Sequence, residues 1–141
     1  MGFLSWWRGN APEPDSQLDL FGNSQDLAQS ERVDGAIVNR DFNAAIRNAG
    51  GSGRCHGRAV QGETQELFDC DVDQLYEATG GRKGDRTTLP QDAQKAYMVN
   101  ETISAHRLNG TDYEGTQQQQ DNAIVADVTD TAHHVCSWFP W

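Results

Sequence analysis

The chain has 141 residues, the length of one average domain, and a formal net charge of −10 at pH 7. Its 21 acidic residues outnumber the 11 lysines and arginines, so the surface as a whole should repel nucleic acid, and direct nucleic-acid binding is not expected. Only 36% of the residues are hydrophobic, which allows no more than a small core.

Residues 1–16 are expected to form an extended N-terminal arm. The start MGFLSWWRG is followed by GNAPEPDSQ, whose prolines, glycine and short polar side chains are typical of a connector. The chain ends on a second aromatic segment, CSWFPW. Large apolar side chains exposed on a small protein usually mark an interface. The candidate interface residues are Phe3, Leu4, Trp6, Trp7, Trp138, Phe139 and Trp141.

Residues 17–110 are expected to form a helical domain with at least three helices. The apolar spacing from Val38 to Ala49 predicts a helix that ends at Gly50. A second helix is predicted from Leu67 onward, ending at the glycine pair 80–81. A third is predicted over residues 89–108, with Thr88 and Gln91 at capping-box spacing before it.

Residues 111–122 are interpreted as a polar, glutamine-rich linker, and residues 123–141 as a C-terminal segment with an aromatic tail. Periodicity leaves open whether this last segment is a helix or a strand. The predicted fold class is therefore mainly α, a small helical domain with extended aromatic N- and C-terminal arms. The alternative is an α+β fold with a short C-terminal strand.

The segment GGSGRCHGR, residues 50–58, lies where positive charge gathers. Between Arg32 and Arg58 there are five arginines and only two aspartates. Glycine backbones can approach an anion closely, and the arginine fork matches phosphate or carboxylate. The candidate anion- or partner-binding residues are Arg40, Arg47, Arg54, His56 and Arg58. The simpler interpretation, which the sequence favours, is a glycine helix cap followed by a flexible polar turn.

Cys55 beside His56 raises the question of a nucleophilic or metal site. Neighbours in sequence rarely present both side chains to one substrate, so no catalytic residue is assigned. His133 and Cys136 would complete a four-ligand set, but no pair has the spacing of a structural zinc site. We expect no cofactor and no metal, with Cys55, His56, His133 and Cys136 as low-ranked metal candidates.

Cysteine usage and the first residues indicate a compartment. Three cysteines without CxxC spacing are typical of a reducing environment. The apolar run at the N-terminus is too short for a signal peptide or a membrane span. The sequence predicts a cytoplasmic protein with no membrane contact, or a virion protein if a phage encodes it.

Three segments, NRDFNAAIRNAGGSGRCHG, LYEATGG and LPQDAQKAYMVNETISAHRL, resemble accessory domains of phage and plasmid proteins related to the DNA-damage-inducible protein D and the BRO-type antirepressors. The likeness covers about half of the chain and includes Glu101 and Arg107. It implies an accessory protein of a mobile element or a stress response, without known catalysis. It assigns no functional residue, and the DNA-reading module of such proteins is not recognisable here.

Together these observations predict a non-enzymatic binding or assembly protein, associated with a phage or mobile element, whose aromatic arms dock onto a second copy or another protein. The first alternative is an acidic decoy, a DNA mimic or a sponge that binds a phosphate-bearing ligand through the arginine and glycine segment. The second and least favoured alternative is an enzyme that depends on cysteine and histidine.

Overall fold

The computed structural model describes residues 2–10 and 24–141, and of residues 24–33 it describes the backbone alone. This part of the chain is helical and contains no strand, which confirms the mainly α fold and makes the alternative with a C-terminal strand wrong. The elements are α1 (Phe3–Asn10), α2 (Ser24–Asn48), α3 (Cys55–Phe68), α4 (Val72–Thr79), the 3-10 turn η1 (Arg86–Thr88), α5 (Gln91–Asn109) and α6 (Gln117–Cys136).

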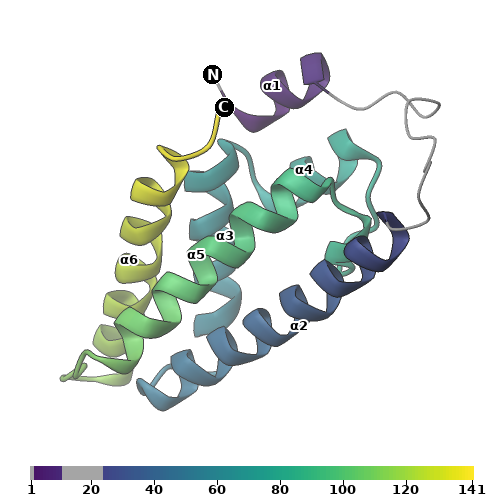
Figure 1. Cartoon of the computed structure of the whole chain (residues 1–141). Coiled ribbons are helices and arrows are strands. Elements are labelled where there is room, and N and C mark those ends of the chain that lie inside the picture. The colour runs from purple at the N-terminus through teal and green to yellow at the C-terminus, as the bar shows by residue number, and fades with distance from the viewer. Residues whose placement is uncertain (1, 11–23) are drawn as a thin grey trace.

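Four long helices, α2, α3, α5 and α6, make the body of the fold (Figure 1). α3 packs mainly on α6, α2 mainly on α5, and α5 also on α6. α1 lies across the end of this bundle where α6 finishes, so the N- and C-terminal ends of the chain are side by side (Figure 1). None of the helices in the described ranges is long and apolar enough to cross a membrane.

The apolar core consists of two clusters at opposite ends of the bundle. One cluster surrounds Phe68 and Tyr97 near the chain ends, and the other surrounds Phe42 and Ile124. Both contain several alanines, whose small side chains let the helices approach closely while burying little surface. The core is small and divided, as the low share of hydrophobic residues requires.

The helix predicted from Leu67 to the glycine pair is two helices. The chain breaks after Phe68, where Asp69 adopts a left-handed conformation with φ of 53°. Asp71 then starts α4 through a reciprocal capping box with Gln74. The apolar residues kept the helical spacing across the break, so periodicity alone could not reveal it.

The segment interpreted as a glutamine-rich linker is partly helical. α6 begins at Gln117, because Thr116 and Gln119 form a capping box that satisfies the first backbone N–H groups. Only residues 110–116 connect α5 to α6, and α6 continues to Cys136. Residues 117–122 therefore belong to the bundle and not to a linker.

The expected start of α5 is also corrected. Thr88 belongs to η1, and its hydroxyl donates to the carbonyl of Asp85 at 2.6 Å while accepting the backbone N–H of Arg82. It therefore forms no capping box with Gln91, and Pro90 precedes the helix instead. The predicted stop at Asn109 and Gly110 is confirmed, and so is the left-handed Gly50 after α2, with φ of 98°.

The N-terminal arm, expected to be extended, is helical over Phe3–Asn10 and rests on the bundle. Residues 11–16 of the expected arm and connector, and residues 17–23 of the expected domain, lie outside the described residues.

Candidate functional site

A layer of buried polar side chains separates the two apolar clusters. Along α3, the buried face passes from Ala59 of one cluster to Leu67 of the other through two polar residues. On α5 and α6 as well, buried polar residues lie between the apolar residues of one cluster and those of the other. The members of this layer are Glu63, Thr64, Asn100, Glu101, Ser104 and Thr131. Buried polar groups need partners, so the layer is the most demanding part of the interior.

Two carboxyl groups, Glu63 and Glu101, stand at its centre, with exposed fractions of 0% and 1%. Glu63 Oε1 accepts a hydrogen bond from Asn100 Nδ2 at 3.1 Å. Glu101 Oε1 accepts from Arg86 Nη1 at 2.7 Å and from Asn39 Nδ2 at 3.2 Å. Glu101 thereby ties α5 to α2 and to η1.

The two carboxyls interact with each other electrostatically. Burial raises the pKa of Glu63 well above its ordinary value, and the adjacent Glu101 raises it further. Oε2 of each carboxyl has no hydrogen-bond partner in the described structure. A protonated Glu63 adds no negative charge to this buried layer.

Other polar atoms of this interior remain unmatched. Asn100 Oδ1, Ser104 Oγ and His56 Nε2 are buried and have no hydrogen-bond partner in the described structure. Native interiors contain few such atoms, and they often mark ordered water or a functional region. The unmatched atoms mark the polar layer as a candidate functional region of the interior.

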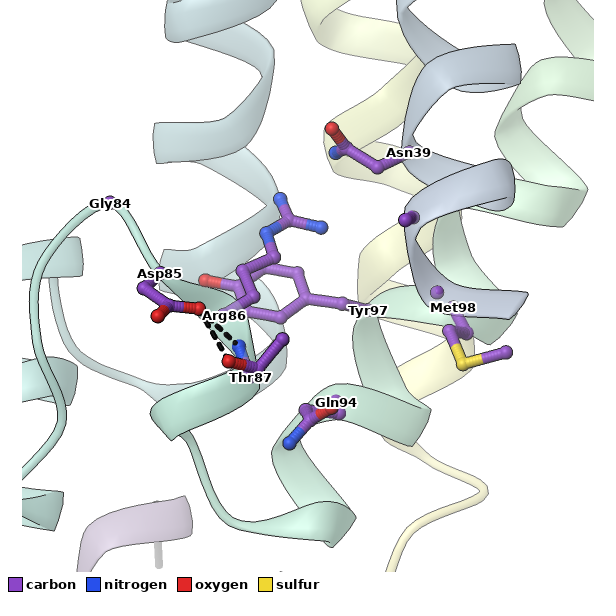
Figure 2. A pocket seen from close by; sticks show the side chains of 10 residues that line it. Asn39, Gly84, Asp85, Arg86, Thr87, Gln94, Tyr97 and Met98 are labelled. Atoms are coloured by element: carbon purple, nitrogen blue, oxygen red, sulfur yellow. Dashed lines mark hydrogen bonds between the residues drawn. The ribbon is translucent and has the colours of Figure 1, made fainter. Parts of the chain in front are cut away.

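Arg86 leads from this layer to a cavity of about 300 Å³ between α2, α5 and the loop that contains η1. The Arg86 side chain is 27% exposed, and its Cζ lies 4.0 Å from the centroid of the Tyr97 ring. Figure 2 shows the guanidinium between Tyr97 and Asn39. The lining residues are Gly35, Ala36, Asn39, Gly84, Asp85, Arg86, Thr87, Gln94, Tyr97 and Met98.

Hydrogen bonds fix both sides of Arg86. Asp85 accepts the backbone N–H of Thr87 at 3.1 Å and its hydroxyl at 2.5 Å, as the dashed lines in Figure 2 show. The Tyr97 hydroxyl donates to Thr64 Oγ1 at 2.6 Å, since the Thr64 hydroxyl itself donates to the carbonyl of Val60. Burial raises the Tyr97 pKa above its usual range, so this tyrosine stays neutral.

The geometry of the cavity favours binding over acid–base chemistry. A catalytic acid or base must reach the proton that it transfers, and neither Glu63 nor Glu101 lines this cavity. The one lining carboxylate, Asp85, is engaged by Thr87 and by Arg82 Nη2 at 2.8 Å. What the cavity offers a small molecule is a positioned guanidinium and an apolar wall.

The arginines predicted as an anion site lie on the surface. Arg40, Arg47, Arg54 and Arg58 are exposed, on α2, on the turn after it and on the first turn of α3. Arg40 lies 3.7 Å from Asp41, and Arg58 Nη2 donates to Asn122 Oδ1 at 2.8 Å. His56 is half-buried beside the Phe42 ring.

A carboxylate of the same chain, that of Asp121, already occupies the turn in GGSGRCHGR. The backbone N–H of Ser52 donates to Asp121 Oδ1 at 2.9 Å, and its hydroxyl donates to Oδ2 at 2.5 Å. These bonds lower the pKa of Asp121 below its ordinary value. Residues 55–58, expected within a flexible turn, are instead the first turn of α3. An external phosphate would have to compete with Asp121 here.

The cysteine and histidine candidates are not brought together. Cys55 lies at the start of α3 with its thiol toward the carbonyl of Asp121, whereas His133 bonds to Glu66 near the other end of α3. Burial raises the pKa of Cys55 to about 11, so its thiol stays protonated at neutral pH. No group of three His, Cys, Asp or Glu side chains in the described ranges could hold a metal ion.

The two aromatic ends meet in one cluster. Phe3 is fully buried, and its ring lies 5.1 Å from that of Phe68 and 4.8 Å from that of Trp141. Trp6 also packs on Trp141, whose Nε1 donates to the carbonyl of Leu67 at 2.6 Å. The ends therefore pack within their own chain. Leu4, Trp6, Trp7, Phe139 and Trp141 are partly buried against this cluster.

The C-terminal segment also presents apolar surface to solvent. Trp138 is 67% exposed, the most exposed of the large hydrophobic side chains in the described structure. Its chain neighbours Ser137 and Phe139 line a groove of about 520 Å³, together with Trp141, Cys136, Glu66, Asp69 and His133 among others. We call Trp138 and this groove the aromatic end face.

Comparison with known proteins adds no functional assignment: no protein-family model matches the chain, and no curated protein or solved structure matches it significantly.

Sequence reasoning missed the polar layer, although one signal was present. Cys55, Ala59, Glu63 and Leu67 follow one another at intervals of four, which places Glu63 on the buried stripe of α3. An acidic residue at such a position is rare unless it is paired. Arg86 gave no comparable signal, because it lies in a short polar loop whose path only the three-dimensional structure reveals.

Proposed function

We propose that this chain is a non-enzymatic binding protein that docks another protein through the aromatic end face. The observation that carries the proposal is Trp138, a large indole that is 67% exposed in the same C-terminal segment whose Phe139 and Trp141 line a groove. Tryptophan is enriched at the energetic centres of protein interfaces, because burying it removes a large apolar area from water. An exposed tryptophan without such a role would only lower solubility.

Charge indicates the kind of partner. The groove carries Glu66 and Asp69, and the whole chain has a net charge of −10. A segment that presents an apolar side chain next to a lysine or arginine would match the aromatic wall and the acidic rim. A second copy of this chain matches the wall but repels through its charge, so a basic partner is the better fit.

Selection of peptides from a random display library on the immobilised protein tests this function. We expect enriched peptides that combine a bulky apolar residue with a neighbouring lysine or arginine. Trp138→Ala should weaken their binding at least about tenfold, the cost of losing an interface hot spot. The control is Ile37→Ala, which removes another exposed apolar side chain from α2, 42% exposed against 67% for Trp138.

Three outcomes would contradict the proposal as stated. The first is that no peptide is enriched, and the second is that enriched peptides bind Trp138→Ala as tightly as the unaltered chain. The third is a concentration-dependent dimer in sedimentation experiments that Trp138→Ala dissolves, which would assign the same face to self-assembly instead.

A further inference from the structure

We propose that the cavity beside Arg86 binds a small organic carboxylate. This site is separate from the aromatic end face and does not depend on the docking function. Its lining residues lie on α2 from Gly35 to Asn39, on the loop that contains η1, and on the first half of α5.

Arg86 provides the recognition group. Its guanidinium carries five N–H donors, and in the described structure only Nη1 has a hydrogen-bond partner, Glu101. Stacking on the Tyr97 ring at 4.0 Å fixes the plane of the guanidinium at the cavity. A planar carboxylate can accept two parallel hydrogen bonds from such a fork, with geometry that a lysine could not offer.

The surrounding charges favour a carboxylate over a phosphate. Glu101 already neutralises Arg86, and Asp85 lines the same cavity. A phosphate would add a charge of about −1.5 to −2 beside these two carboxylates, whereas an organic acid adds a single negative charge spread over two oxygens. The single charge has the smaller repulsion to overcome.

The remaining wall fits a short apolar body. Gly35, Ala36 and Met98 line the cavity without a charged group, and Met98 lies across it from the loop of Asp85 and Thr87 (Figure 2). A volume of about 300 Å³ is at the small end of ligand pockets. The ligand class is therefore a compact monocarboxylic acid with an aliphatic or single-ring tail.

Titration with 4-methylpentanoate, followed by ¹⁵N NMR of the Arg86 Nε–Hε group and of backbone amides, tests this site. We expect saturable shifts at Arg86, Tyr97 and Gly84. The uncharged analogue 4-methylpentanamide should bind at least about tenfold more weakly, because it cannot form the charge-assisted pair. Inorganic phosphate should not saturate these resonances over the same concentration range.

Two variants keep the test independent of folding. Gly35→Leu places a side chain toward Met98, where an added Cβ makes only ordinary contact at 3.7 Å, so it fills the cavity and leaves the Glu101 pair intact. Gly57→Leu makes the same change at a helical position with open space and serves as the control. We expect binding to be lost in the first variant and retained in the second.

Any of four results overturns the proposal. In the titrations, these are that 4-methylpentanoate does not saturate the Arg86 resonance, that the amide binds as tightly as the acid, or that phosphate saturates the resonance instead. In the variants, it is that Gly35→Leu binds 4-methylpentanoate as tightly as the unaltered chain. A further variant, Arg86→Lys, keeps a positive charge for Glu101 and should still lose at least about tenfold in affinity, because the fork is gone.

Discussion

At the scale of single residues, the carboxyl pair of Glu63 and Glu101 is the most unusual feature of the interior. Two buried carboxylates would repel strongly, and the raised pKa of Glu63 avoids this by keeping Glu63 protonated. The energy of the polar layer thus depends on pH. Each unit by which the folded pKa exceeds the unfolded one corresponds to about 1.4 kcal/mol.

The sign of this dependence gives a prediction for Glu63→Gln. The folded state holds the extra proton, so its stabilisation is complete below the ordinary range of glutamate and is lost as pH rises through the raised pKa. Glutamine stays neutral at every pH and keeps an acceptor for Asn100. Urea denaturation from about pH 5 to about pH 9 should show the unaltered chain losing stability relative to the variant.

Glu77→Gln, at an exposed position on α4, is the control for this series and should follow the unaltered chain. If the curves for Glu63→Gln and the unaltered chain ran parallel over the whole pH range, the raised pKa of Glu63 would be refuted.

At the scale of elements, the ends of the helices decide the fold more than their apolar stripes do. α3 and α4 are separated by a left-handed Asp69 and a capping box, and α6 starts at Thr116 through another capping box. Helix ends leave several backbone groups without partners, so a side chain that satisfies them fixes where a helix begins.

Two glycines in this fold should respond to alanine in opposite directions. Gly50→Ala is strained by its φ of 98° and by the approach of its Cβ to within 2.6 Å of the Gln120 side chain, so a loss of about 1 kcal/mol or more is expected. Gly57→Ala, inside α3 with open space around it, should gain up to about 1 kcal/mol. Thermal denaturation of both variants measures the difference, and equal melting temperatures would contradict it.

The same elements show what the sequence could predict and why the rest was out of reach. The helix near Val38–Ala49 and the stop at Gly110 follow from spacing and glycine chemistry, which are local. The break after Phe68 depends on one left-handed aspartate, and the cavity at Arg86 depends on a loop folding back against α5. The break is a local backbone conformation that apolar spacing does not register, whereas the cavity depends on a contact between separate elements, which no local pattern encodes.

At the scale of the whole molecule, the two ends of the chain close one end of the bundle. Phe3 and Trp141 are in contact although they come from opposite ends of the sequence, and both rest on Phe68. The aromatic residues that the sequence placed in extended arms complete the thin core. Trp138 stays outside this core, so mutation can separate the role of the aromatic ends in stability from the proposed role of Trp138 in docking.

Trp141→Ala and Trp138→Ala test this separation. Loss of Trp141 removes ring contacts with Phe3 and Phe139 and the hydrogen bond to Leu67, and about 2 to 4 kcal/mol of stability should go with them. Loss of the exposed Trp138 should change stability by no more than about 0.5 kcal/mol. Chemical denaturation of both variants provides the comparison, and equal losses would show that Trp138 is part of the core.

The meeting of the two chain ends also bears on the order in which the molecule assembles. The entropic cost of closing a loop rises with the length of chain that it encloses, and the contact between Phe3 and Trp141 encloses nearly all of it. This contact gains the least from proximity along the chain, so it should form after the helices have packed and open before they separate. The contact between Phe3 and Trp141 can therefore open while the polar layer and the Arg86 cavity stay in place.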